Sequence, residues 1–207
     1  MTGTDPGADL RFYLKDARDA VLLKLEGLSE YDVRRPLTPT GTNLLGLVKH
    51  LTGAEAMYFG ETFGRPFPDA PPLWVTGATK EPNADLWATP EESQEWIVGT
   101  YRRACAHADE TIAALPLDAV GRVPFEPYPE IPLHRLIVHM IGETHRHAGH
   151  ADIVRELIDG AVGLRGPDDN LPSEDGDWWA GHRERVERAA RAARPTTARS
   201  PRPDEAG

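Results

Sequence analysis

The sequence predicts an all-α fold: a four-helix bundle with two long crossover connections and one further helix near the C-terminus. Four long segments carry apolar residues at steps of three and four, which is the spacing of one helix face. Pro- and Gly-rich joints separate these segments, and we expect no strand to compete with them. The length of 207 residues suits one domain over residues 1–194, followed by a disordered tail at 195–207.

The first two helices are predicted from apolar periodicity and from their end signals. The first covers about residues 9–28, where apolar side chains recur on one face. The second begins near Thr42 or Asn43, either of which is a suitable N-cap, and it stops before Gly64. The Pro-rich, acidic and aromatic stretch 67–88 then forms a long loop, and the sequence leaves open whether that loop closes as a lid.

The third helix carries the clearest predicted start. Thr89 is the expected N-cap, Pro90 occupies the first helical position, and Glu92 completes a capping box. Pro116 is expected to end this helix, because proline lacks the N–H that a helix interior requires.

The fourth helix is expected over about residues 132–159, after an irregular stretch at 122–132. Gly160 is its natural stop, since glycine accepts the left-handed conformation of a helix C-terminus. A short charged helix is predicted over residues 177–193. These elements complete the four bundle helices and the appended fifth.

Composition narrows the classes of partner. The formal net charge is −10, from 33 acidic residues against 23 Lys plus Arg, which argues against nucleic acid or an anionic membrane. No apolar run approaches the ~20 residues of a membrane span. The single cysteine, Cys105, permits no internal disulfide and is expected to be a small core residue. We therefore expect a cytoplasmic protein, with a homodimer left open.

The fourth predicted helix contains the strongest candidate site. Five of the eight histidines lie between positions 134 and 150, and within that run Glu143 and His147 are four residues apart. That spacing places both side chains on one helix face, on a stripe that is otherwise apolar. A buried carboxylate must be neutralised, paired or bound to a metal. The spacing alone allows either a divalent metal site or a buried ion pair.

A third metal ligand would have to come from another helix. His50 flanks the apolar side of the second predicted helix, although a lone histidine there also fits a helix edge. Two imidazoles and one carboxylate match a catalytic zinc site with an open position, and they equally suit iron or nickel. His150 and His139 lie near the same face of the fourth helix, whereas His145 is expected to face away.

The sequence resembles a known family in three stretches: LLGLVKHLTGAEAMYF, RLIVHMIGETHRHAGHADIVRELIDG and DDNLPSEDGDWWAGHRERV. They are similar to the DinB/YfiT-like superfamily, and most of all to its actinobacterial branch of mycothiol-dependent, maleylpyruvate isomerase-like S-transferases. The resemblance implies an up-down-down-up bundle that holds one divalent metal, zinc first, through His50, Glu143 and His147. Many members have histidine at the position of Glu143.

The resemblance also implies a chemistry. A metal-activated thiolate, with mycothiol as co-substrate, would be added to an electrophilic small molecule in detoxification or in a thiol-dependent isomerisation. His150 and Arg146 are candidate catalytic residues that would contact the thiol or the substrate. Two alternatives stay open: a metal-dependent hydrolase with Glu55 or His150 as general base, and a non-catalytic metal-binding stress-response protein.

Overall fold

The computed structural model describes residues 5–68, 72, 74, 81–123, 129–163, 171–173 and 175–193. The chain divides into two compact units, residues 1–168 and 169–207, each of which is described by itself. The predicted tail at 195–207 lies outside the described residues, as does much of the loop 67–88.

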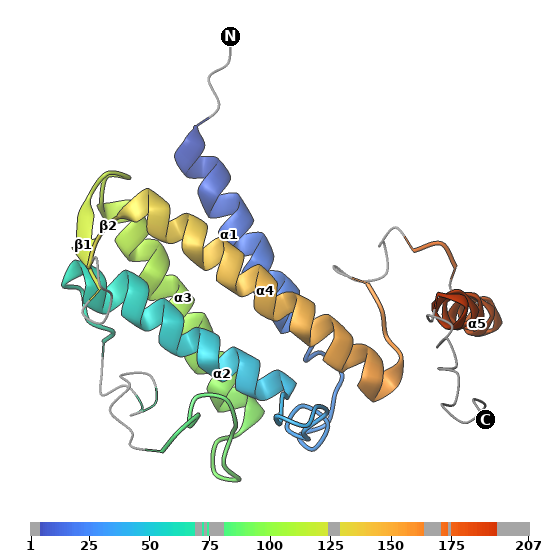
Figure 1. Ribbon diagram of the computed structural model, residues 1–207. Helices are drawn as coiled ribbons and strands as arrows, with labels where there is room; N and C mark the ends of the chain where they lie inside the picture. The colour runs from blue at the N-terminus through green and yellow to red at the C-terminus, as the bar shows by residue number, and fades with distance from the viewer. Residues whose placement is uncertain are drawn as a thin grey trace, which may run out of the picture. The chain divides into compact units, whose positions relative to one another are not determined.

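The first unit is mostly helical, as the sequence predicts. Its elements are α1 (Pro6–Leu23), α2 (Leu44–Glu55), a π-helix (Ala56–Gly60), a 3₁₀ helix (Glu61–Phe63), α3 (Gln94–Ala114), β1 (Val120–Arg122), β2 (Glu130–Pro132) and α4 (Leu133–Asp159). Helix α1 packs chiefly against α4, and α2 packs against both α3 and α4. Helices α1 and α4 run in one direction, and α2 and α3 run in the other (Figure 1).

The ends of α2 and α4 confirm their predicted signals. The Asn43 side chain accepts the Gly46 N–H at 2.8 Å and so caps the start of α2. The helical path continues through the π- and 3₁₀ turns and stops at Gly64, whose φ is 65°. Helix α4 ends at Gly160 with φ 78°, the left-handed conformation that glycine adopts without steric cost.

The predicted boundaries of α1 and α3 were wrong by several residues. Helix α1 begins at Pro6, where Asp5 caps it, and ends at Leu23 instead of continuing to residue 28. Helix α3 begins at Gln94 with Ser93 as its N-cap, and Thr89 is not its cap. The Glu92 carboxylate does accept the Thr89 N–H at 2.8 Å, as in a capping box, but the chain there forms a turn.

The structure also contains two short strands that no pattern in the sequence predicted. Strands β1 and β2 form an antiparallel pair, with Val120 opposite Pro132 and Arg122 opposite Glu130. Each strand has three residues, which is too short to show the alternation of polar and apolar side chains that reveals a strand in a sequence.

Two large clusters of buried side chains form most of the core among the described residues of this unit, and a small third one joins Ala56 and Trp74. One large cluster contains Leu44, Leu45, Val48 and Leu51 of α2, together with Ala148, Ala151 and Val154 of α4. The other large cluster contains Leu14, Ala54 and Phe59 with the first half of α4, Leu133 to Met140. Helix α4 therefore contributes to both clusters, which fixes its rotation about its own axis.

The second unit contains α5, Gly176–Ala192, close to the predicted charged helix. Asp175 caps its start by accepting the Asp177 N–H at 3.0 Å, and no residue of α5 is buried. Within the described residues, no helix is long and apolar enough to cross a bilayer.

Candidate metal site

The structure brings the three predicted ligands together between α2 and α4. One donor atom from each of His50, Glu143 and His147 lies within 4.8 Å of the other two. The His147 Nε2 atom is 3.0 Å from Glu143 Oε1, and the His50 Nε2 atom is 3.6 Å from the same oxygen. The two imidazole rings stand edge to face, with their centroids 4.9 Å apart. Two imidazoles and a carboxylate thus converge on one point.

Glu143 and His147 lie at the edge of the core, which corrects the prediction that they occupy core positions. Their side chains are 24% and 13% exposed, and His50 is 29% exposed. The fully buried positions in this part of α4 are Thr144 and Ala148 instead. Glu143 and His147 each precede one of these buried residues by one position, which turns them by about 100° around the helix. They therefore lie at the boundary between the core and solvent, on the side that meets His50 of α2. The site is therefore reachable from outside.

The protonation states of the site suit a cation. Burial alone would raise the pKa of Glu143, but hydrogen bonds and charge interactions with His147 and His50 outweigh it and lower that pKa. Burial lowers the pKa of His147, the neighbouring His50 lowers it further, and Glu143 opposes both effects only in part. At neutral pH the set then offers an ionised carboxylate and a neutral imidazole, the forms in which these groups bind metals.

The His50 ring has a second partner that sequence reasoning missed. Its Nδ1 atom lies 2.8 Å from the Asp85 Oδ2 atom, which leaves Nε2 directed toward Glu143. Asp85 belongs to the loop before α3, and no local pattern in the sequence relates that loop to α2. Only the acidic composition of residues 67–88 hinted that a carboxylate was available.

Other predicted residues surround the three ligands at different distances. The His150 Nδ1 atom lies 3.4 Å from His147 Nδ1, at an exposed position. Arg146 is exposed and makes no hydrogen bond or ion pair with any described residue. One turn before Glu143, the His139 ring meets the Tyr58 ring edge to face at 5.1 Å. His134 lies at the start of α4, and its Nδ1 atom is 3.0 Å from the Leu117 carbonyl oxygen.

Glu55 is fully buried in an ion pair and is not part of the His50, Glu143 and His147 group, which argues against it as the general base of the hydrolase alternative. Its carboxylate is fully buried and accepts two hydrogen bonds of 2.7 Å from Arg18 of α1. Arg18 also donates to Asp109 of α3 at 2.7 Å, so this network ties α1, α2 and α3 together. The role of Glu55 in the structure is to pair a buried cation.

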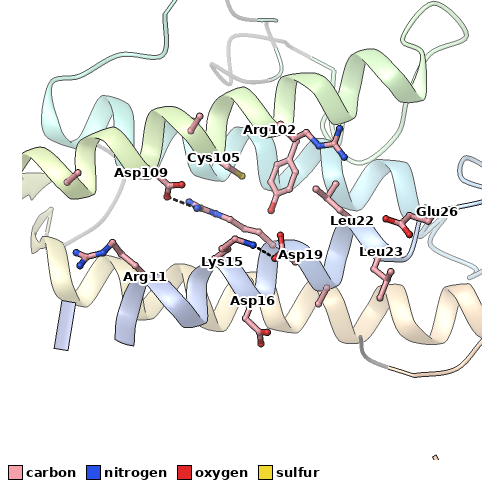
Figure 2. Close-up of a pocket in the computed structure, with 15 residues that line it drawn as sticks. Arg11, Lys15, Asp16, Asp19, Leu22, Leu23, Glu26, Arg102, Cys105 and Asp109 are labelled. Atoms are coloured by element: carbon pink, nitrogen blue, oxygen red, sulfur yellow. Dashed lines mark hydrogen bonds and ion pairs between the residues drawn. The ribbon is translucent and has the colours of Figure 1, made fainter. Parts of the chain in front are cut away.

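A groove of about 940 Å³ lies between α1 and α3 and contains none of the predicted site residues. Figure 2 shows Cys105 and Asp109 on α3 facing Lys15 and Asp19 on α1, with Asp109 bonded to Arg18. Burial, and then the Glu55 carboxylate, raise the pKa of the Cys105 thiol well above its usual range. The only cysteine of this chain is therefore protonated at neutral pH and supplies no thiolate.

A family comparison agrees with this geometry. The sequence model of the mycothiol-S-transferase family matches residues 9–160, well over half of the chain, and the match includes all three ligands. A comparison with curated proteins found no match. Because the match covers residues 9–160, the chain belongs to the mycothiol-S-transferase family.

Proposed function

We propose that this protein is a metal-dependent S-transferase that joins the thiol of mycothiol to an electrophilic small molecule, in detoxification or in a thiol-dependent isomerisation. One observation carries the proposal: within a member of this family, His50, Glu143 and His147 bring their donor atoms within 4.8 Å of one another. We propose further that helices α1 to α4 form the DinB-like up-down-down-up bundle, and that the enzyme works in the cytoplasm.

The donor set fits one divalent metal ion, and we propose zinc, with nickel or iron as the alternatives. Two imidazoles and one carboxylate are the ligand types of a catalytic zinc site that keeps a position for substrate. When bound there, the ion would lower the pKa of a coordinating thiol and stabilise it as the thiolate. Because Cys105 is only partly exposed and its pKa is raised, it stays protonated, and the thiol comes from a second molecule.

The side chains around the ligands have separate roles in this proposal. The ionised Glu143 carboxylate provides the only negative charge among the three ligands. His150 is exposed beside His147, and its imidazole can accept the proton that the thiol gives up. Arg146 is exposed on the same helix, and its guanidinium is free among the described residues to pair with a carboxylate of the thiol or the electrophile.

The test is direct. The purified protein, loaded with zinc, is mixed with mycothiol and 1-chloro-2,4-dinitrobenzene, and the absorbance of the thioether is followed. In this reaction the thiolate sulfur forms a bond to the ring carbon, the carbon–chlorine bond breaks, and chloride leaves. We expect a rate above the metal-free control that disappears in His147→Ala and persists in the matched variant His145→Ala. Equal rates with and without metal would refute the proposal, and hydrolysis of an ester without any thiol would favour the hydrolase.

A further inference from the structure

The loop that precedes α3 is fastened onto α2 by consecutive residues. Each contact joins a loop residue to the helix that carries His50. The contacts are Asp85 Oδ2 with His50 Nδ1 at 2.8 Å, Leu86 O with Asn43 Nδ2 at 3.1 Å, and Trp87 O with Lys49 Nζ at 2.9 Å. Because two of these contacts hold backbone carbonyls, the path of the loop is fixed independently of the Asp85 side chain.

Gly46 shows how closely the loop approaches the helix. A Cβ atom added to Gly46 would overlap the Leu86 carbonyl oxygen and lie 2.6 Å from its carbonyl carbon. Both atoms are backbone, so neither can move aside as the end of a side chain would. Glycine weakens a helix interior, yet here it lets Leu86 lie directly against α2. The docking of the loop therefore depends on a glycine one turn before His50.

Lys49 provides a second anchor that does not touch the metal site. Its side chain is only 2% exposed, and its Nζ atom lies 2.7 Å from Glu92 Oε2. Glu92 also accepts the Trp74 Nε1–H at 2.7 Å and the Thr89 N–H at 2.8 Å. A buried lysine is stabilised by such a pairing, and this pairing holds the loop against α2.

We propose that Asp85 is a positioning residue for the metal site, and that the loop docked against Gly46 and Lys49 sets its place. The proposal rests on the metal binding of the proposed function. The Asp85 carboxylate accepts the proton of His50 Nδ1, which fixes the tautomer that presents the lone pair of Nε2 toward Glu143. A carboxylate behind a ligand histidine orients the ring and raises its basicity, and the loss of such a partner weakens metal binding by roughly 10- to 100-fold.

The test measures zinc affinity of the full chain by competition with a chromophoric chelator. We expect Asp85→Ala to weaken zinc binding by about 10- to 100-fold. Asp85→Asn should recover most of the affinity, because the amide oxygen still accepts from Nδ1–H. The matched control is Glu91→Ala, an exposed acid of the same segment with no partner among the described residues, and it should leave the affinity unchanged. Gly46→Ala should weaken binding as Asp85→Ala does.

A second readout needs no metal. Long-range ¹H–¹⁵N spectra of the metal-free protein report which ring nitrogen of His50 carries the proton. We expect Nδ1–H in the wild type and in Asp85→Asn, and a shift toward Nε2–H in Asp85→Ala. If the wild type binds zinc and Asp85→Ala binds it equally well with the same tautomer, the positioning role is overturned while the proposed function stands. If the wild type binds none of zinc, nickel and iron, both are overturned.

Discussion

The His50 Nε2 and Glu143 Oε1 atoms lie 3.6 Å apart, one on α2 and the other on α4. His147, one turn after Glu143, completes the group from the same helix. The site therefore depends on how α2 and α4 are placed relative to each other. Substituting one side chain at a time tests each ligand without removing the helix that carries it.

Removal of either histidine should abolish stoichiometric metal binding. His50→Ala and His147→Ala each leave two ligands, which are too few for a three-ligand site. Elemental analysis of the purified variants should show a loss of most of the bound metal, while circular dichroism shows an unchanged helical content. His145→Ala serves as the control, since His145 is outside the ligand group, and a normal metal content in His147→Ala would count against the site.

Glu143→His should retain metal, because an imidazole nitrogen replaces the carboxylate oxygen as the donor at that position. Glu143→Ala should lose it, because no donor remains at that position. The measurement is again metal content, paired with the rate of thiol transfer. Equal loss in both variants would indicate that the negative charge of Glu143 is required.

Cys105→Ala should leave the rate of thiol transfer within about twofold of the wild type. Its thiol lies in the α1–α3 groove, and burial raises its pKa, so it is protonated and takes no part in the reaction that we propose. Steady-state kinetics with mycothiol and an electrophile check this. A loss of activity with intact metal content would assign the cysteine a role that its environment does not predict.

Arg18→Ala should destabilise the protein strongly, by about 3–5 kcal/mol, because it leaves the Glu55 carboxylate buried without its partner. The double variant Arg18→Leu with Glu55→Leu should recover much of that loss, since neither member of this buried pair is then left charged and unpaired. Urea denaturation gives the free energies. Lys15→Ala, which breaks an exposed pair with Asp19, is the control and should have little effect.

Acid should weaken the attachment of the loop through Glu92. Burial alone would raise the pKa of Glu92, but Lys49, the Thr89 N–H and Trp74 outweigh it and lower that pKa below 4.5. A carboxylate whose pKa is lower in the folded state than in the unfolded state stabilises the fold at a pH above its unfolded-state pKa. This stabilisation disappears as the pH falls through its folded-state pKa. The stability difference between wild type and Glu92→Gln should therefore be largest at pH 7 and shrink below pH 4.5.

Urea denaturation of both proteins at pH 7, 5 and 3 checks the acid prediction. Glu91→Gln is the matched control, since Glu91 is exposed beside Glu92 and has no partner among the described residues. A difference between wild type and Glu92→Gln that stays constant over the three pH values would contradict the prediction.

Local signals predicted the elements whose causes are local. The cap of Asn43, the stop at Gly160 and the Glu143–His147 spacing each depend on atoms within about one helical turn, and all three are present in the structure. Thr89 failed as a cap because its partner Glu92 also binds Lys49 of α2 and Trp74, contacts that hold the chain in a turn. A tertiary interaction thus overrode a correct local pattern.

The sequence by itself determined the helical class, most helix ends and the pairing of an acid with an imidazole on one helix face, because backbone hydrogen bonding and helix periodicity act over a few residues. The family resemblance added His50 to this pair, and the structure brings the three together. Only the tertiary structure decided that Asp85 lies behind His50 and that Glu55 is paired with Arg18. Those contacts join residues far apart in the chain, and their geometry follows from how helices pack and where loops dock, which no local spacing encodes.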